Sequence, residues 1–161
     1  MYALTLHQPW AGLVASGIKR IENRSWKPND RMIGQLIAIH AGQRFDKPAD
    51  ALMQSLLHDG DRPVPQHLSE ARGAIVATCR IGAFVHGDIE AAKLIGKDQQ
   101  RWFFGPHGWV LSEIEQLETP LLCRGYQKLW NIPLPIAYKL TADRLLPDAP
   151  SPQTGGNNET R

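Results

Sequence analysis

The chain has 161 residues, of which 42% are hydrophobic and 21% are charged, and its formal net charge is +2 at pH 7. This composition is typical of a globular domain and excludes collagen-like, mucin-like and wholly disordered chains. No run approaches the ~20 apolar residues that span a bilayer, and the opening MYALTLHQPW lacks a signal-peptide pattern. Two cysteines are too few for a disulfide framework. We therefore expect a reduced, cytoplasmic protein with no membrane partner, and a net charge too small to indicate nucleic acid by itself.

The predicted elements are short and of mixed type. In chain order they are a strand over Ala3–Leu6, a helix that starts after Pro9 and stops at Gly17, a strand over Gly34–His40, a helix over Pro48–Leu57, a Pro-rich loop over Asp59–Gln66, a long strand over Gly73–Val85 with a break at Gly82, a helix to Ile95 with Asp88 as its N-cap, and strands over Gly108–Ser112 and Leu129–Ile132. Several strands and a few helices without regular βαβ alternation predict an α+β domain, which a small barrel with helices outside would satisfy.

The C-terminal stretch differs from the rest of the chain. Its sequence, PDAPSPQTGGNNETR over residues 147–161, has almost nothing to bury. Such a segment cannot offset its own ordering entropy. We expect a folded domain over residues 1–146 followed by a disordered tail.

Motifs for common cofactors and metals are missing from the sequence. It has neither a GxxxxGK[ST] loop nor a GxGxxG fingerprint, and neither HExxH nor GxSxG. The six histidines are scattered, with no CxxC or HxH partner. We predict no cofactor and no metal site, although a site assembled from distant histidines stays open.

The most informative segment is Gly17–Arg31, which holds five basic and two acidic residues. Its net charge of +3 exceeds that of the whole chain, so the positive charge is local. A regular strand here would have no apolar face, so an ordinary half-buried strand is not expected. A turn or bulge near Arg20 would instead bring Lys19 and Glu22 together. Such a pair in a concave site can bind a polar ligand or transfer protons. The alternative is that the charges are a solvated surface and that the nearby tryptophans pack in the core.

The run HQPWAGLVASGIKRIENRSW, residues 7–26, resembles the opening of an ASCH domain, a member of the PUA-like superfamily of small β-barrels. The family signature GxKxxExR is matched at each fixed position, by Gly17, Lys19, Glu22 and Arg24. The flanking HQPW and SW resemble a common subgroup of the family. With the later strand-like segments, the resemblance covers residues 2–133.

The resemblance implies a barrel of five to six mixed strands with flanking short helices. It also implies a cleft between barrel and helix, lined by Lys19, Glu22 and Arg24. The family is associated with RNA binding, and some members bind DNA. One branch deacetylates acetylcytidine with a Lys–Thr–Glu set, and another member is a metal-independent ribonuclease. In this sequence Glu22 stands in place of that threonine, and the segment where the later glutamate should fall, 78–80, has no carboxylate, so the residues depart from that deacetylation mechanism. Thr78 and Cys79 are alternative cleft residues, although Thr and Cys on a strand more often have a packing role.

We therefore expect an RNA-binding domain with a nucleotide-sized cleft. Lysine and arginine would contact phosphate, a tryptophan would stack on an unpaired base, and Glu22 would accept hydrogen bonds from a base amino group. The candidate binding residues are His7, Gln8, Trp10, Lys19, Arg20, Glu22, Arg24, Trp26 and His40. The expected partner is single-stranded RNA or a nucleotide-like ligand, with DNA as an alternative, bound by a monomer.

Two alternatives belong to other functional classes. In the first, the protein is a hydrolase acting on RNA or a modified nucleoside, with Lys19 and Glu22 as its catalytic residues. In the second, it is a protein-interaction or small-ligand-binding domain in transcription or translation regulation. No pattern in the sequence specifies the target RNA or its base preference.

Overall fold

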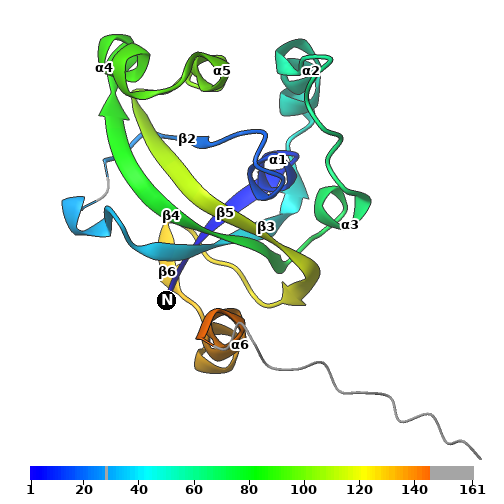
Figure 1. The fold of residues 1–161 in the computed structure, drawn as a ribbon. Helices are drawn as coiled ribbons and strands as arrows, with labels where there is room; N and C mark the ends of the chain where they lie inside the picture. The colour runs from blue at the N-terminus through cyan, green and yellow to red at the C-terminus, as the bar shows by residue number, and fades with distance from the viewer. Residues whose placement is uncertain (28, 146–161) are drawn as a thin grey trace, which may run out of the picture.

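The computed structural model describes residues 1–27 and 29–145 (Figure 1). The strands are β1 (Tyr2–Gln8), β2 (Ile21–Arg24), β3 (Leu36–Phe45), β4 (Ala74–His86), β5 (His107–Leu122) and β6 (Leu129–Asn131). The helices are α1 (Trp10–Ala15), the 3-10 helix η1 (Asp30–Met32), α2 (Lys47–Leu56), α3 (Gln66–Ser69), α4 (Gly87–Leu94), α5 (Lys97–Gln100) and α6 (Leu134–Leu145). The expected α+β fold is confirmed.

All six strands form one sheet in the order β2-β5-β4-β3-β1-β6. β1 and β3 are parallel, and the other neighbouring pairs are antiparallel. The long β4 and β5 cross the middle of the molecule (Figure 1), and their pairing shifts register three times. Such bulges bend a strand and increase its twist. The sheet curls into a barrel-like form but remains open, with β2 and β6 as its edges.

The predicted break in β4 coincides with one of these irregularities. The register of β4 with β5 shifts between Ile81 and Ala83, on either side of Gly82. A side chain at Gly82 would meet Ser112 Oγ and the Val110 carbonyl at 3.4–3.5 Å. These are ordinary van der Waals contacts, so the space at this irregularity would accept a Cβ.

Helix α1 lies against the sheet, and five of its residues, Ala11 to Ala15, are buried. Its apolar side chains join those of β1, β3 and β4 and Trp109 of β5 in the main core cluster. A second cluster, which includes Leu13, Ile21 and Trp102, connects α1 to the region of α4 and α5. Burial of this helix on two sides fixes the position of the segment that follows it.

The chain reverses after α1 and enters β2. Gly17 has a φ of +75°, a left-handed conformation that favours glycine. The Lys19 N–H then donates to the Leu13 carbonyl at 3.1 Å, which turns the Lys19 side chain inward beside the start of β2. β2 pairs with β5, with Glu22 opposite Trp109. The turn and the short edge strand together carry the charged motif.

Some elements differ from the sequence-based predictions. β5 continues to Leu122, and α6 follows β6, whereas the sequence indicated a strand ending at Ser112 and no helix there. Asp88 lies in the first turn of α4 rather than at its N-cap, which is His86. The predicted tail, residues 147–161, lies outside the described residues. Within the described ranges, none of the helices has the length and hydrophobicity required to cross a bilayer.

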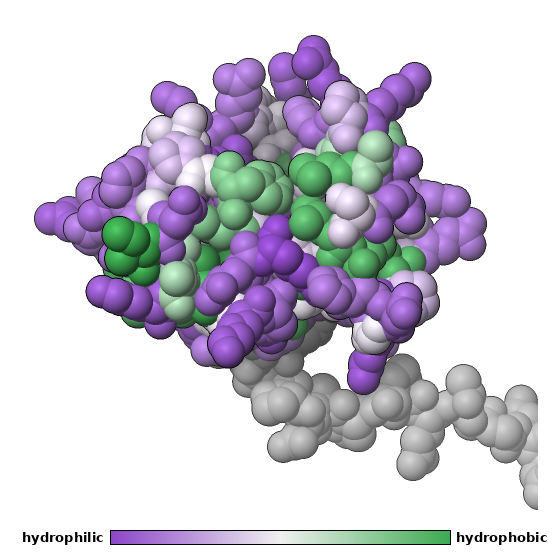
Figure 2. Space-filling view, turned by 90° about the horizontal axis from the view of Figure 1, so that it is seen from above, coloured by the Kyte–Doolittle hydropathy of each residue, from purple (hydrophilic) through white to green (hydrophobic). Residues whose placement is uncertain are grey.

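Viewed from the side on which α2, α4 and α5 lie, the surface is mixed (Figure 2). Apolar patches lie toward the middle of that face, and hydrophilic side chains surround and separate them. The elements there carry exposed apolar residues, namely Leu52 on α2 and Ile89 and Leu94 on α4.

Candidate nucleic-acid interface

The Lys19 side chain is buried, and its ammonium group contacts three partners. Its side chain is 2% exposed, and its Nζ lies 2.9 Å from Glu22 Oε2. Nζ also donates to the Ile21 carbonyl and lies 5.6 Å from the centroid of the Trp10 ring. The predicted proximity of Lys19 and Glu22 is therefore confirmed.

Glu22 joins Lys19 to Arg24. Glu22 Oε1 lies 3.2 Å from Arg24 Nη2, which also donates to the Thr5 carbonyl at 3.3 Å. Within the described part of the chain, Arg24 Nε is buried and has no hydrogen-bond partner. Lys19, Glu22 and Arg24 thus form a continuous row, which we call the ion-pair row. Its two ends face different hollows.

The first hollow, which we call the ion-pair hollow, has a volume of about 370 Å³. Lys19 and Glu22 form part of its wall, with Asp46 and the rings of Trp10 and Phe104. Trp10 Nε1 donates to Asp46 Oδ2 at 3.2 Å, and the two rings lie 5.9 Å apart between centroids. This arrangement combines an aromatic surface with fixed carboxylates, as small-molecule sites often do.

The second hollow, which we call the cationic hollow, has a volume of about 700 Å³. Four of the predicted site residues line it: His7, Arg24, Trp26 and His40. The other charged residues in its lining are Arg44, Arg124 and Lys128, and no carboxylate is present among the described residues that line it. Tyr126, which is 52% exposed, adds a second aromatic ring.

His40 lies beneath this hollow rather than on its surface, since it is 2% exposed. Its Nε2 lies 3.0 Å from the Cys123 carbonyl, and its ring packs edge-on against Trp130 at 5.5 Å. Burial holds the pKa of His40 below its ordinary value, and the hydrogen bond to the Cys123 carbonyl opposes this only partly. His40 is thus favoured in its neutral form.

Two of the predicted residues lie outside both hollows. Gln8 is fully buried, where its amide donates to the Leu68 and Ala71 carbonyls and accepts from the Gly12 N–H. Arg20 points to Asp98, with 2.7 Å between the charged atoms. The pKa of Asp98 lies below its usual value, chiefly because Gln99 donates a hydrogen bond to it, with a smaller contribution from Arg20.

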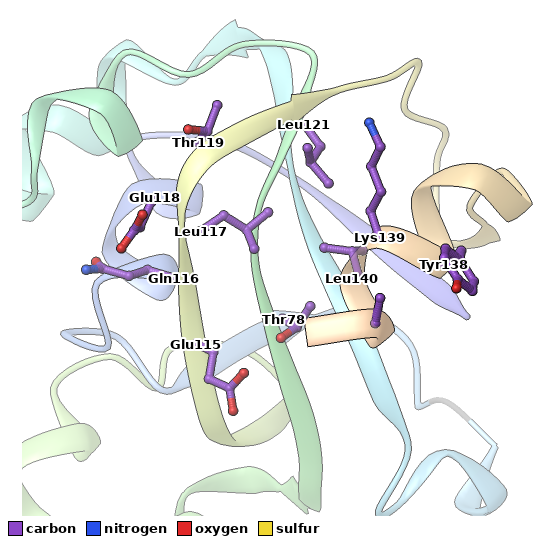
Figure 3. Close-up of a pocket in the computed structure, with 11 residues that line it drawn as sticks. Thr78, Glu115, Gln116, Leu117, Glu118, Thr119, Leu121, Tyr138, Lys139 and Leu140 are labelled. Carbon is purple, nitrogen blue, oxygen red and sulfur yellow. The ribbon is translucent and has the colours of Figure 1, made fainter. Parts of the chain in front are cut away.

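Thr78 and Cys79, the two residues considered as alternative cleft residues, lie elsewhere. Cys79 is in the main core cluster and has no exposed surface. Thr78 lines a separate hollow of about 600 Å³ between β5 and α6, with Leu117 and Leu140 close by (Figure 3). Neither residue contributes to the wall of the ion-pair hollow.

Two histidines that are far apart in the sequence meet at the paired ends of β4 and β5. His86 Nδ1 and His107 Nδ1 lie 3.2 Å apart, and the ring centroids are 4.7 Å apart. Across residues 1–27 and 29–145, no three His, Cys, Asp or Glu side chains are grouped so that they could hold a metal ion.

Sequence reasoning missed the remaining charged and aromatic residues of the cationic hollow, namely Arg44, Arg124, Tyr126 and Lys128. Arg44 is near the end of β3, whereas the other three follow β5 in the loop that leads to β6. The run CRGYQK, residues 123–128, mixes basic and aromatic residues and was the available signal. The sequence alone did not indicate that this run lies beside β3, so it could not be assigned to a site.

An open, curled mixed sheet with flanking helices is the fold of the PUA-like class of small domains. The chain belongs to the ASCH domain family, whose model matches residues 4–138.

Relatives of two kinds are similar to this chain. Mouse activating signal cointegrator 1 is 46% identical over 69 residues, which are 43% of this chain and only 8% of that protein. The crystal structure of an ASCH protein from Zymomonas mobilis matches with a TM-score of 0.50 at 17% identity, over 88% of this chain and 93% of that one. Crystal structures of two mutants of that bacterial protein match with the same score and identity, over 94% and 96% of their chains. At this identity the likeness shows the fold alone.

Proposed function

We propose that this ASCH domain binds single-stranded nucleic acid, RNA above all, and that Gly17, Lys19, Glu22 and Arg24 are its GxKxxExR signature. The observation that supports this most is the ion-pair hollow. A buried Lys–Glu pair forms its polar wall, and two aromatic rings stand beside that pair. Its volume of about 370 Å³ falls in the range of small-ligand sites, roughly 300–1,000 Å³.

Each part of this wall has a role in the proposal. The ring of Phe104, 51% exposed, offers a surface on which an unpaired base can stack. Glu22 accepts a hydrogen bond from a base amino group, which distinguishes bases as phosphate contacts cannot. Lys19 is a positioning residue, because its ammonium is already held by Glu22 and by the Ile21 carbonyl.

Fluorescence anisotropy with labelled single-stranded RNA and DNA tests the proposal. Phe104→Ala is expected to weaken RNA binding about 5- to 150-fold, the effect of losing one base–aromatic contact. Ile89→Ala on α4 is the matched control, because Ile89 is also exposed but lies outside the ion-pair hollow. Absence of binding to any oligonucleotide at low salt, or equal binding by Phe104→Ala and wild type, would refute it.

The hydrolase alternative has weaker support from the same geometry. The described residues of the ion-pair hollow include no hydroxyl or thiol side chain that could serve as nucleophile. A hydrolase would therefore have to activate water with the Lys19–Glu22 pair. Incubation of the pure protein with acetylcytidine, and separately with RNA in EDTA, tests this, and substrates that remain unchanged over hours would exclude both reactions.

A further inference from the structure

We propose that the cationic hollow is a second nucleotide site, in which Arg44, Arg124 and Lys128 bind the phosphates and Tyr126 stacks on the base of a neighbouring nucleotide of the same strand. This inference rests on the proposed function, since it extends the strand whose first base occupies the ion-pair hollow. Apart from Arg24, the charged residues that line this site lie outside the signature.

The charge distribution supports an anionic ligand. Across the described ranges, Arg44, Arg124 and Lys128 form no ion pair with a carboxylate within 4.0 Å. Elsewhere, Lys27 and Arg80 are surface cations whose charged atoms lie 2.9 Å from a carboxylate partner. Cations that line one concavity without a carboxylate create a positive potential that attracts phosphate.

The aromatic ring indicates that the anion carries a base. Tyr126 packs edge-on against Trp130, with 5.5 Å between ring centroids, and the Arg124 guanidinium lies 5.3 Å from the Tyr126 centroid. Arg124 thus lies over one face of the Tyr126 ring, and the residue is still 52% exposed. An exposed tyrosine next to arginines is the combination with which proteins hold single-stranded nucleic acid. A free inorganic phosphate has no base to stack on such a ring.

The loop that carries these residues is held in place by His40. The Cys123 carbonyl is hydrogen-bonded to His40, and Gly125 lies so close that a Cβ there would be 2.2 Å from His40 Cε1. Arg124, Tyr126 and Lys128 therefore project from a backbone that is fixed against β3. His40, itself buried, is a positioning residue in this site.

The ion-pair row connects the two sites. Arg24 lines the cationic hollow, and its partner Glu22 lines the ion-pair hollow, with 3.2 Å between their charged atoms. In the proposed complex, a strand that places a base beside Glu22 continues past Arg24 into the cationic hollow. It follows that oligonucleotides should bind more tightly than single nucleosides, and that the difference should depend on salt.

The experiment compares an eight-nucleotide single-stranded RNA with a single nucleoside. In the variant Arg44→Ala/Arg124→Ala/Lys128→Ala, RNA affinity is expected to fall at least about tenfold at low salt. The slope of log K against log salt is expected to drop by about 2, because each lost phosphate contact contributes ~0.7 for single strands. Nucleoside binding should be unchanged. The control Arg31→Ala/Lys93→Ala/Lys97→Ala removes the same charge from exposed positions outside both hollows.

A second variant, which removes an aromatic ring and no charge, tests the stacking part of the proposal. Tyr126→Ala is expected to weaken RNA binding about 5- to 150-fold without changing the salt slope. If wild type binds RNA but the triple variant and Tyr126→Ala bind equally well, the second site is refuted while the proposed function stands. Equal losses in the control triple, or displacement of RNA by poly-glutamate of the same charge, would also refute the second site. If wild type binds no RNA, both proposals fail.

Discussion

Replacing Lys19 with methionine tests whether the ion-pair row acts as a buried structural unit. Lys19→Met keeps an unbranched side chain but removes the ammonium from a position that is 2% exposed. Glu22, whose side chain is 10% exposed, then loses its 2.9 Å partner. Removing one member of a buried pair costs about 3–5 kcal/mol, because the remaining charge stays buried.

The expected value lies at the lower end of that range. Glu22 keeps Arg24, whose Nη2 lies 3.2 Å from its other oxygen. We therefore expect the free energy of unfolding to fall by about 3 kcal/mol, which corresponds to a Tm lower by roughly 6–12 °C for a domain of this size.

The chain offers a closely matched control. Lys27 and Asp30 form a pair with the same i,i+3 spacing and the same 2.9 Å separation, but their side chains are 55% and 70% exposed. Lys27→Met should cost less than about 1 kcal/mol. Urea unfolding followed by circular dichroism measures both variants.

A double-mutant cycle completes the test. In the cycle with Glu22→Gln, the double variant should lose about 1–3 kcal/mol less than the sum of the two single variants. If Lys19→Met costs no more than Lys27→Met, or if the cycle is additive, the reasoning about the ion-pair row is wrong.

Three further predictions concern residues around the two hollows. Burial lowers the pKa of His40 below 6.5, and the hydrogen bond to the Cys123 carbonyl opposes this decrease only partly. As the pH falls, His40 is therefore protonated in the unfolded chain before it is protonated in the folded chain. The stability contributed by neutral His40 is therefore complete above about pH 6.5 and is lost toward its folded-state pKa, at up to ~1.4 kcal/mol per pH unit. The stability gap between wild type and His40→Gln should shrink from pH 7 to pH 5 in urea titrations. Gly125→Ala should destabilise the fold by about 1–3 kcal/mol and weaken RNA binding, since its Cβ would overlap the His40 ring, whereas Gly60→Ala, with no atom within 4 Å, should do neither. Gln8→Ala should cost at least about 2 kcal/mol in thermal unfolding, because it leaves buried backbone groups without partners.

Each of these three has a contradicting result. A constant gap between wild type and His40→Gln across pH 5–7 would show that this imidazole does not titrate differently on unfolding. Equal behaviour of Gly125→Ala and Gly60→Ala would show that the loop moves freely. If Gln8→Ala unfolds at the same temperature as wild type, other groups must satisfy the buried backbone groups that Gln8 leaves unpaired.

The sequence predicted the elements whose apolar pattern is strong. β4 was expected over most of its length because AIVATC is continuously apolar or small. The second half of β5 was missed because the apolar residues of EIEQLE, residues 113–118, are three apart, without the alternation typical of a strand, and most of these positions are exposed. α6 was missed because its apolar residues do not gather on one face: Leu134 and Tyr138 are 84% and 75% exposed, whereas Leu140 is 6% exposed.

The candidate site also has one part that the sequence predicted and one part that it did not. The Lys19–Glu22 contact could be predicted because it is local, three residues apart on one turn. The cationic hollow could not, because His40 and the Cys123 carbonyl that meet beneath it are 83 residues apart. Residues that tertiary pairing brings together leave no periodic signal along the chain.

The two edges of the sheet have a consequence for association between copies of the chain. The outer strands, β2 and β6, are four and three residues long. An average strand has about 5–6 residues, so a second copy that docked along either side would find few free backbone groups with which to pair. Short outer strands are one way in which sheet proteins avoid edge-to-edge aggregation. In this domain, the edge strand that carries Glu22 and Arg24 therefore also limits growth of the sheet beyond the ion-pair row.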